Sequence, residues 1–335
     1  MIKFSEGKMN MFLKQSKDTV FRGWIDRIIG DITCKRIPGI HALQRIVCAV
    51  RHLWRLTVSN KKEHSGRFLR LPRIQSVEVE DCPWLPGFIR QGMIEALGLI
   101  FRTLRIYQPA WHVLREWVED SEGVVLDMAS GSGYHIADYS AWSCERNMSI
   151  PQIRVSDLYP DYERLQALER QFPGSIQAVT QPVDAASVPD SLCGGVRTIF
   201  GAFHHFPPET AVRVLTDAVQ NADGILIFEP HPRRIRNLFC NIFGIFFGIA
   251  APFVSGRFTW KRLIFSTLIP VIPVLLVWDG IISVFRAYTR EEMETMIASL
   301  PENDFKWRII NISGPGIGRF LPIQCVMGSA PQQKS

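Results

Sequence analysis

The stretch that decides the fold is Val124-Val125-Leu126-Asp127-Met128-Ala129-Ser130-Gly131-Ser132-Gly133. An apolar run ends in a carboxylate, and a loop of very small residues follows at once. This order predicts a strand, a tight turn and the first turn of a helix. Because alanine and glycine have little or no side chain, the backbone of such a loop can approach a bulky ligand, and the helix N-terminus offers free N–H groups.

The segment resembles the glycine-rich loop of class I S-adenosylmethionine (SAM)-dependent methyltransferases, which is usually written Asp/Glu-x-Gly-x-Gly-x-Gly. Ala129 stands at the first glycine position, a mild departure from that pattern. A nicotinamide-type dinucleotide fingerprint requires Gly-x-Gly-x-x-Gly, and in that frame Ile136 takes the place of the third glycine. The dinucleotide interpretation therefore fits less well, although it stays open.

The elements expected after the loop come in the order that this resemblance implies. Strands are predicted over 153–156, 175–179, 196–200 and 224–228, with helices over 161–172 and 207–221. Strands that alternate with helices predict a parallel, doubly wound sheet that binds its ligand at the carboxyl ends of the strands. Acidic residues fall at or just beyond four of these ends, namely Asp127, Asp157, Asp184 and Glu229.

The C-terminal part supplies two more strands. Thr289 and Glu292 have the spacing of a capping box for a helix that runs to about Leu300. Residues 305–312 and 320–327 then flank Gly314-Pro315-Gly316, which predicts a β-hairpin. Methyltransferases of this class also end in a reversed last strand. The resemblance covers about 119–229 and 287–328 and implies a Rossmann-like α/β fold, a doubly wound seven-stranded sheet.

The resemblance also implies SAM as the cofactor and indicates where it binds. Asp157 would accept hydrogen bonds from the vicinal ribose hydroxyls, with a helix N-cap as the alternative role. Asp184 lies where the family places an acidic residue beside the adenine. The residues expected to contact SAM are Asp127, Ala129, Ser130, Gly131, Gly133, Asp157, Leu158, Asp184, Ala185 and Gly201.

His204 and His205 are the predicted catalytic residues, because they follow the fourth strand, next to where the methyl group should project. An imidazole has an ordinary pKa of about 6.5, which suits proton abstraction near neutral pH. One of them serving as a structural histidine is the alternative, and Tyr134 and Glu229 are weaker candidates. A metal site at this pair lacks a third ligand at useful spacing, so no metal is expected.

An apolar insertion separates the fifth strand from the last helix. Residues 237–256 and 263–278 carry no charge, and each is close to the roughly 20 helical residues that cross about 30 Å of hydrocarbon. Both neighbouring strands belong to one sheet, so the insertion begins and ends on the same side. Two complete spans would place Arg257, Lys261 and Arg262 on the far side, against the positive-inside tendency.

Pro270 and Pro273 also weaken a straight second span. We therefore expect a helical hairpin that lies in one leaflet, with the basic turn at the headgroups and Trp260 and Trp278 as interfacial anchors. A buried helical pair in a soluble core or a dimer interface is the alternative.

The region before residue 119 is expected to be helical. Within 41–58 the apolar residues follow helical spacing and Arg45, Arg51 and Arg55 occupy other positions, which predicts a basic amphipathic helix on anionic lipid. A helix packed on the catalytic domain fits equally well. The helix over 87–106 is expected to cover a hydrophobic substrate, although core packing also explains its apolar residues, Phe88, Ile89, Met93, Leu97, Ile100 and Phe101.

Composition adds a few bounds. The net charge of +6 is too modest to decide a partner, and no nucleic-acid-binding motif is present. The seven cysteines lack metal-type spacing and suit a reducing cytoplasm. Charges interrupt any early apolar run, so no signal peptide is expected. The predicted units are a helical region and lid (1–118), the SAM-binding core (119–236), the apolar insertion (237–284) and the closing elements (285–335).

Together these features predict a SAM-dependent methyltransferase for a hydrophobic small molecule, lipid-like or isoprenoid. We expect it on the cytoplasmic face of a membrane, as a peripheral or monotopic protein. Two alternatives remain: a soluble natural-product methyltransferase whose insertion is a lid or dimer interface, and a non-catalytic membrane-associated scaffold with the same fold. The methyl acceptor and the oligomeric state stay open.

Overall fold

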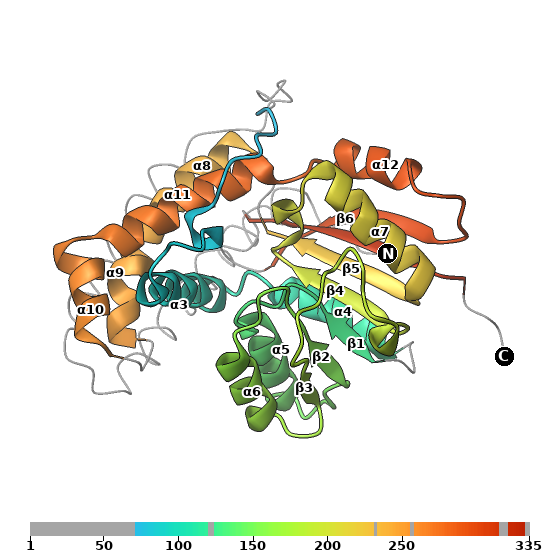
Figure 1. Cartoon of the computed structure of the whole chain (residues 1–335), viewed down its shortest axis with the longest axis horizontal. Coiled ribbons are helices and arrows are strands. Elements are labelled where there is room, and N and C mark those ends of the chain that lie inside the picture. Colours follow the sequence, from blue (N-terminus) through green and yellow to red (C-terminus); the bar gives the residue numbers. More distant parts are fainter. Residues whose placement is uncertain (1–70, 120–123, 231–232, 255–257, 315–320, 332–335) are drawn as a thin grey trace, which may run out of the picture.

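The computed structural model describes residues 71–119, 124–230, 233–254, 258–314 and 321–331 (Figure 1). The predicted amphipathic helix over 41–58 lies outside the described residues.

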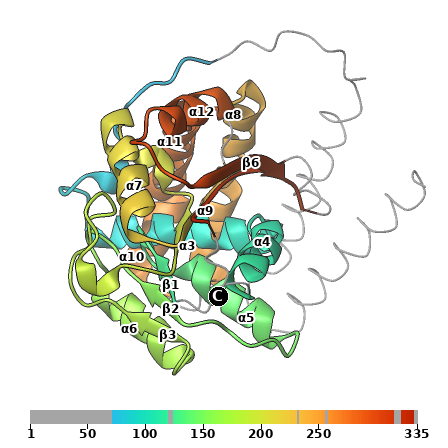
Figure 2. The same cartoon turned by 90° about the vertical axis from the view of Figure 1, so that its right-hand side faces the viewer.

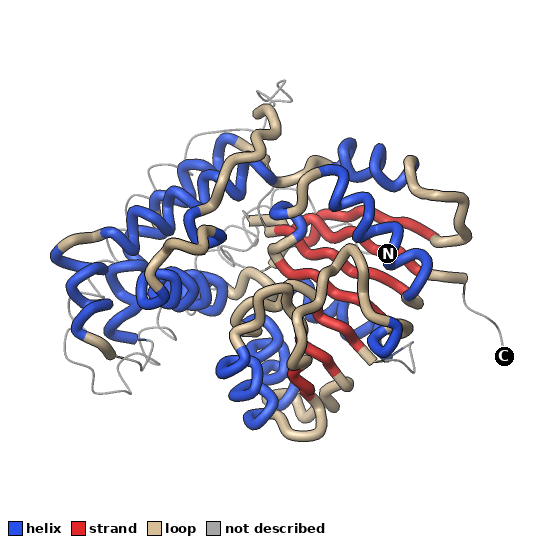
Figure 3. Tube along the Cα trace, viewed as in Figure 1, coloured by secondary structure: helices blue, strands red, loops and turns tan. Residues whose placement is uncertain are grey.

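The centre of the molecule is one seven-stranded sheet (Figure 3). Its strands are β1 (Val125–Asp127), β2 (Ile153–Val155), β3 (Ile176–Ala178), β4 (Val196–Phe200), β5 (Gly224–Glu229), β6 (Lys306–Ile312) and β7 (Ile323–Ser329). They are ordered β3-β2-β1-β4-β5-β7-β6. The first five are parallel, and β7 runs antiparallel to both β5 and β6. This order confirms the predicted fold, including the reversed last strand.

Helices cover both faces of the sheet, so the central strands are buried and mostly apolar, and the guanidinium of Arg197 in β4 is paired with the Asp217 carboxylate. Every residue of β4 and β5 is buried, as expected for parallel strands between two helical layers. One layer holds α4 (Gln108–Glu119), α5 (Tyr134–Cys144) and α6 (Tyr162–Gln171), and the other holds α7 (Pro208–Asn221) and α12 (Arg290–Ala298). Figure 2 shows α4 and α7 on opposite sides of the strands.

The predicted element ends are displaced by only a few residues. The capping box of α12 is confirmed, since the Thr289 hydroxyl accepts from the Glu292 N–H and the Glu292 carboxylate accepts from the Thr289 N–H. That helix ends at Ala298 rather than near Leu300. The last strand begins at Ile323, three residues later than predicted.

The insertion forms more elements than the predicted hairpin of two helices. It comprises α8 (Ile235–Ile242), α9 (Gly244–Val254), α10 (Trp260–Leu263), a π-helical turn η4 (Ile264–Leu268) and α11 (Val271–Arg286). The second apolar run breaks before α11 because Pro270 lacks the N–H that would continue the ladder. Figure 1 shows α9 and α10 at the end of the molecule away from the sheet.

The insertion packs against α3 (Gly87–Leu104), the helix that was expected to cover the substrate. Ile89 and Met93 of α3 are buried against Ile272 of α11, and Ala96 is buried with Ala251 and Leu276. For these residues the structure bears out the core-packing alternative, because α9 and α11 cover the apolar face of α3.

The predicted basic turn is wrong at one of its three residues. Arg262 is buried, and its guanidinium donates to the Glu95 carboxylate at 2.8 Å and to the Gln91 side-chain oxygen at 2.7 Å, both on α3. It therefore fastens the insertion to α3 instead of facing headgroups, since a buried arginine requires a paired acid. Lys261 lies with its amino group 5.9 Å from the Phe88 ring centre.

Among the described residues no single helix is both long and apolar enough to cross a membrane. Length and composition suffice for a crossing only when two segments are taken together. These are Trp260–Leu268 and Val271–Arg286, which are bent by 69° relative to each other.

A close approach between α9 and α11 generates a stability prediction. A Cβ added at Gly248 would lie 2.9 Å from the Cα of Pro273. We expect Gly248→Ala to destabilise the protein, because overpacking costs about 1–3 kcal/mol and exceeds the helix-propensity gain of about 1 kcal/mol. Thermal unfolding followed by circular dichroism measures the effect. The matched control is Gly244→Ala, whose added Cβ would meet nothing closer than 3.7 Å and should leave the melting temperature unchanged or raised.

Candidate functional site

The loop between β1 and α5 adopts the backbone that its small residues allow. Ala129, Gly131 and Gly133 all have positive φ, at 52°, 54° and 66°. A Cβ added at Gly131 would meet nothing within 4 Å, whereas one at Gly133 would lie 2.7 Å from the Leu168 side chain. Space is therefore free beside Gly131, whereas Gly133 is closely packed. A ligand can approach the loop on the side of Gly131.

Asp127 holds this loop from below. Its carboxylate is fully buried and accepts hydrogen bonds from the Thr198 hydroxyl at 2.6 Å, the Ser130 hydroxyl at 2.6 Å and the His135 Nε2 at 2.9 Å. Ser130 is buried as well. These two predicted cofactor residues thus use their side chains to fix the loop, and the Ser130 backbone also serves the fold, since its N–H donates to the Ser156 carbonyl at 2.9 Å and its carbonyl accepts from the Gly133 N–H at 2.8 Å. His135 was missed by the sequence analysis, because nothing in its local pattern distinguishes it.

Asp157, at the end of β2, lies directly beside the open part of the loop. Its carboxylate accepts from the Gly131 N–H and from the Tyr159 N–H, each at 2.8 Å. Its backbone oxygen accepts from the Val183 N–H at 2.9 Å, which brings the loop after β3 to the same place. Asp184 is exposed in that loop and its carboxylate accepts from the Ala186 N–H at 2.9 Å. The structure therefore brings Gly131 and Asp157 into contact, and it places Asp184 in a loop that is hydrogen-bonded to Asp157 through Val183.

The remaining predicted cofactor residues differ in their surroundings. Leu158 is 44% exposed beside Asp157, and Ala185 is buried. Gly201 has a positive φ of 58°, and the Tyr107 hydroxyl occupies the space that a side chain there would need. Gly201 therefore makes room for Tyr107, which neither the spacing nor the composition of the sequence indicates.

Tyr107 links the loop between β1 and α5 with a second cluster, which surrounds the two histidines. The charges of Asp127 and Glu229 both act on its phenol, and burial raises its pKa well above the ordinary value. Its ring lies edge-on to Phe200 at 5.3 Å and is stacked on Phe101 at 4.9 Å. Burial likewise raises the pKa of Tyr134, so this weaker catalytic candidate is a neutral phenol at neutral pH.

His204 and His205 lie in the short helix η3 (Phe203–His205) at the end of β4. The Nδ1 of His204 is 2.8 Å from the Glu229 carboxylate, whose other oxygen accepts from the Phe203 N–H at 2.7 Å. The Nδ1 of His205 is 3.1 Å from the Asp81 carboxylate. Each ring is therefore held at one nitrogen by an acidic residue.

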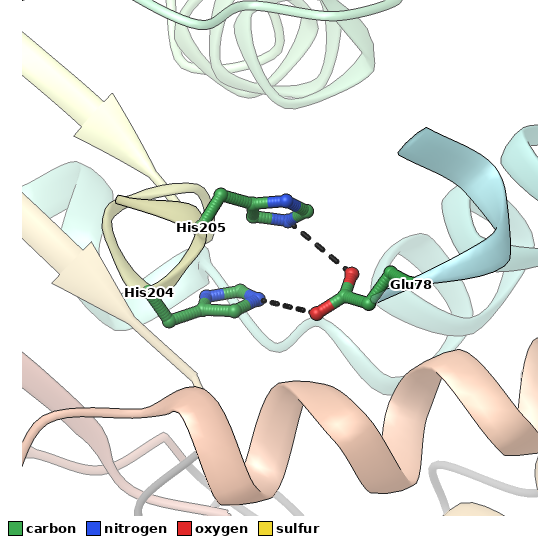
Figure 4. Close-up of side chains that lie close together, drawn as sticks. All are labelled: Glu78, His204 and His205. Atoms are coloured by element: carbon green, nitrogen blue, oxygen red, sulfur yellow. Dashed lines mark ion pairs between the residues drawn. The ribbon is translucent and has the colours of Figure 1, made fainter. Parts of the chain in front are cut away.

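The other nitrogen of each ring faces Glu78, as Figure 4 shows. The two Nε2 atoms lie 3.6 Å and 3.4 Å from the two carboxylate oxygens of Glu78. Glu78 comes directly before the short helix η1 (Val79–Asp81), more than 120 residues from the histidines in the sequence. No third ligand is found near the histidine pair along the sequence, but the tertiary structure brings a third candidate ligand, Glu78, to the pair.

Arg286, at the end of α11, completes this cluster. One guanidinium nitrogen lies 3.3 Å from the Glu78 carboxylate and 3.1 Å from that of Asp81, and another donates to the His205 carbonyl at 2.8 Å. Burial would raise the pKa of Glu78, but the nearby His204 and His205 rings and the charge of Arg286 lower it to about 2.

The same cluster changes the proton affinity of His204. Burial would lower its pKa, but the charge of Glu229, the hydrogen bond with Glu229 and the nearby carboxylate of Glu78 raise it to about 10. A group with that pKa keeps its proton at neutral pH, so in this arrangement His204 does not have the properties of the predicted general base. His205 is the more accessible of the two, with 31% of its side chain exposed.

Comparison with known proteins adds little. No protein-family model and no curated protein matches this sequence. Among solved structures, the plantazolicin methyltransferase BpumL in complex with SAH has a TM-score of 0.41 and 10% identity, over 72% of this chain and 86% of that one.

Two further solved structures are similar at the same level. Magnesium protoporphyrin IX methyltransferase from Synechocystis PCC 6803 with bound SAH has a TM-score of 0.39 and 13% identity, over 75% and 91% of the two chains. A putative O-methyltransferase from Nostoc punctiforme PCC 73102 has a TM-score of 0.42 and 14% identity, over 77% and 64%. These similarities are weak. The fold therefore rests on the strand order of this chain, and the candidate site rests on its own geometry.

The positive φ of Ala129 gives a prediction for the loop. We expect Ala129→Gly to raise the free energy of unfolding slightly, by less than about 1.5 kcal/mol. The left-handed conformation costs alanine about 1–2 kcal/mol, and glycine offsets part of that gain through its freedom in the unfolded chain. Urea unfolding measures the change. Ala218→Gly, in the interior of α7, is the control and should lower stability by about 1 kcal/mol; a loss in both variants contradicts the strain at Ala129.

Proposed function

We propose that this protein is a SAM-dependent methyltransferase. The observation that carries the proposal is the contact at the carboxyl ends of β1 and β2, where the Gly131 N–H donates to the Asp157 carboxylate at 2.8 Å beside an open glycine position. The loop that carries Asp184 joins the same place through the Val183 N–H. Parallel α/β sheets bind their ligands at this edge, where the strand order reverses.

The residues present fit SAM. Asp157 accepts one hydrogen bond at each carboxylate oxygen from the chain, and a carboxylate has about four acceptor sites, so capacity remains for two ribose hydroxyls. The open space beside Gly131 suits the methionine part of the molecule, and in the proposed complex Asp184 and Ala185 would be on the adenine side. SAM supplies an electrophilic methyl group when bound, and in-line displacement depends mostly on how the chain positions the two reactants.

The proposed substrate is a hydrophobic small molecule reached at a membrane surface. The support is a group of exposed apolar side chains on the insertion, where a water-soluble surface would normally carry charge. Trp260 is 70% and Leu268 is 77% exposed. The other large exposed apolar residues of the insertion are Ile242, Phe253, Val254, Phe258, Ile269, Val274 and Trp278.

A peripheral or monotopic position on the cytoplasmic face of a membrane follows from this proposal. The exposed group belongs to the part of the molecule that Figure 1 shows away from the sheet, so lipid contact leaves the cofactor edge uncovered. The alternative role for the same surface is a contact between two copies of the chain in a soluble methyltransferase. Vesicle binding by Leu268→Glu distinguishes lipid contact from this contact between copies.

The cofactor prediction concerns Asp157. We expect the wild-type protein to bind SAM and Asp157→Ala to bind it at least about tenfold more weakly, because losing a charge-assisted hydrogen bond costs roughly 1.5–3 kcal/mol. Isothermal titration calorimetry with SAM measures both. Glu302→Ala is the control: Glu302 is exposed just before β6, which starts at the opposite edge of the sheet, so SAM affinity should not change. A folded wild-type protein that does not bind SAM contradicts the proposed function.

The membrane prediction concerns Leu268. We expect the wild-type protein to sediment with phospholipid vesicles and Leu268→Glu to weaken that partitioning at least about tenfold, because burying a leucine side chain contributes about 1.5–3 kcal/mol. Gln171→Glu adds the same charge at an exposed position on α6 and should bind vesicles as the wild type does. SAM affinity should be equal in all three. Wild-type protein that stays in solution and forms a dimer, broken by Leu268→Glu, supports the interface between copies instead.

A further inference from the structure

Three side chains from two distant parts of the sequence converge beside η3. Glu78, His204 and His205 each offer one ligand atom, and these atoms lie within 4.8 Å of one another. Figure 4 shows both imidazole rings pointing at the carboxylate of Glu78. We propose that these residues form a binding site for a first-row divalent metal cation such as Zn²⁺ or Mn²⁺.

The distances are those between ligands of one cation. The two Nε2 atoms are 3.6 Å and 3.4 Å from the nearest Glu78 oxygens, which is longer than the usual 2.7–3.2 Å of an N–H···O hydrogen bond. Zinc binds imidazole nitrogen and carboxylate oxygen at about 2.0–2.2 Å, so two ligands at a tetrahedral angle are about 3.4 Å apart. A cation between these three side chains therefore needs little movement of the chain.

Carboxylates behind the rings orient them for such a cation. In metal sites, a ligating histidine nearly always gives its other ring N–H to a carboxylate, a carbonyl or water. Here the Nδ1 of His204 is 2.8 Å from Glu229, and the Nδ1 of His205 is 3.1 Å from Asp81. Both Nε2 atoms are thereby directed toward Glu78. The Glu78 carboxylate is itself held by the Ser283 hydroxyl, which donates to it at 3.1 Å.

The charges of the cluster also favour a cation. The carboxylates of Glu78, Asp81 and Glu229 give three negative charges, and Arg286, which contacts Glu78 and Asp81, gives one positive charge. A cation displaces the proton of His204, because a ligating imidazole must be neutral; with both rings neutral the balance is −2, which one divalent cation neutralises. Two imidazoles and one carboxylate are a donor set for zinc, manganese or iron rather than for calcium or magnesium, which prefer oxygen ligands.

The site is closed on one side and accessible on the other. Glu78 and His204 are buried, but 31% of the His205 side chain and 45% of the Asp81 side chain are exposed. Three protein ligands leave coordination positions for water or for an oxygen of a bound small molecule, as in catalytic metal sites. That a methyl acceptor binds there rests on the proposed function, whereas cation binding does not.

Metal binding to the full-length chain tests the proposal. The protein is stripped with a chelator, dialysed and titrated with ZnCl₂ and with MnCl₂ in a calorimeter. We expect one cation per chain, and we expect His205→Asn and Glu78→Gln each to weaken its affinity by about 100-fold or more. Asp81→Asn, which removes the negative charge behind His205 and beside Arg286 but no ligand, should weaken it by about tenfold or more.

The control is His112→Asn, since His112 is an exposed histidine on α4 outside the cluster and should not affect the titration. Glu78 is buried and its substitution can impair folding, so the half-exposed His205 provides the second variant, and circular dichroism is recorded for both. X-ray absorption of the zinc-loaded protein should show two imidazole nitrogens and oxygen in the first shell.

Three results overturn the proposal: a wild-type protein that takes up no stoichiometric cation, sulfur ligands in the absorption spectrum, and wild-type affinity in both His205→Asn and Glu78→Gln. SAM binding is measured on the same stripped samples. Stripped protein that binds SAM but no cation removes the metal site and leaves the proposed function standing. Protein that binds the cation but not SAM, with or without the metal, removes the methyltransferase proposal and leaves the metal site.

Discussion

A carboxylate that is fully removed from water needs several donors, and Asp127 has three of them. The Thr198 hydroxyl ties it to β4, the Ser130 hydroxyl ties it to the loop, and His135 ties it to the first turn of α5. The close packing around this one group sets the path of the loop, and that path leaves Gly131 free to meet Asp157. The shape of the loop at the carboxyl ends of β1 and β2, where we propose that the cofactor binds, therefore depends on the burial of Asp127.

A second acidic centre plays the same part for the other half of the molecule. The Asp279 carboxylate of α11 accepts from the Val79 N–H at 2.7 Å and from the Glu80 N–H at 2.9 Å, which fixes the segment before α3 against the insertion. Glu78 and Asp81 are carried by that segment, and Arg286 by the same helix as Asp279. The insertion is thus part of the site, since α11 helps to hold Glu78 opposite the two histidines.

The insertion also explains how one apolar segment can serve two purposes. Its inner side packs on α3 through Ile272, Ala251 and Leu276 and is fastened by the pair of Arg262 with Glu95. Its outer side carries Trp260 and Leu268, which are mostly exposed. The charge-free stretch of the insertion is longer than packing on one helix requires. Both the membrane proposal and the alternative contact between copies start from this extra apolar length.

The sequence alone determined the sheet, because the apolar strand segments, the small-residue loop and the capping box are local signals. Each of them can be recognised without knowledge of the fold. The alternation of strands and helices predicted the parallel, doubly wound sheet, and the positions of Asp157 and Asp184 at strand ends predicted the edge at which the proposed cofactor binds. In the structure Asp157 contacts the loop at Gly131, and the segment that carries Asp184 is hydrogen-bonded to Asp157. Tertiary structure alone decided the rest. Glu78 meets His204 and His205 across more than 120 residues, Arg262 turns inward to Glu95, and Tyr107 fills the space at Gly201. Such contacts depend on how α3, α11 and η3 pack in three dimensions, and no spacing along the chain encodes that packing.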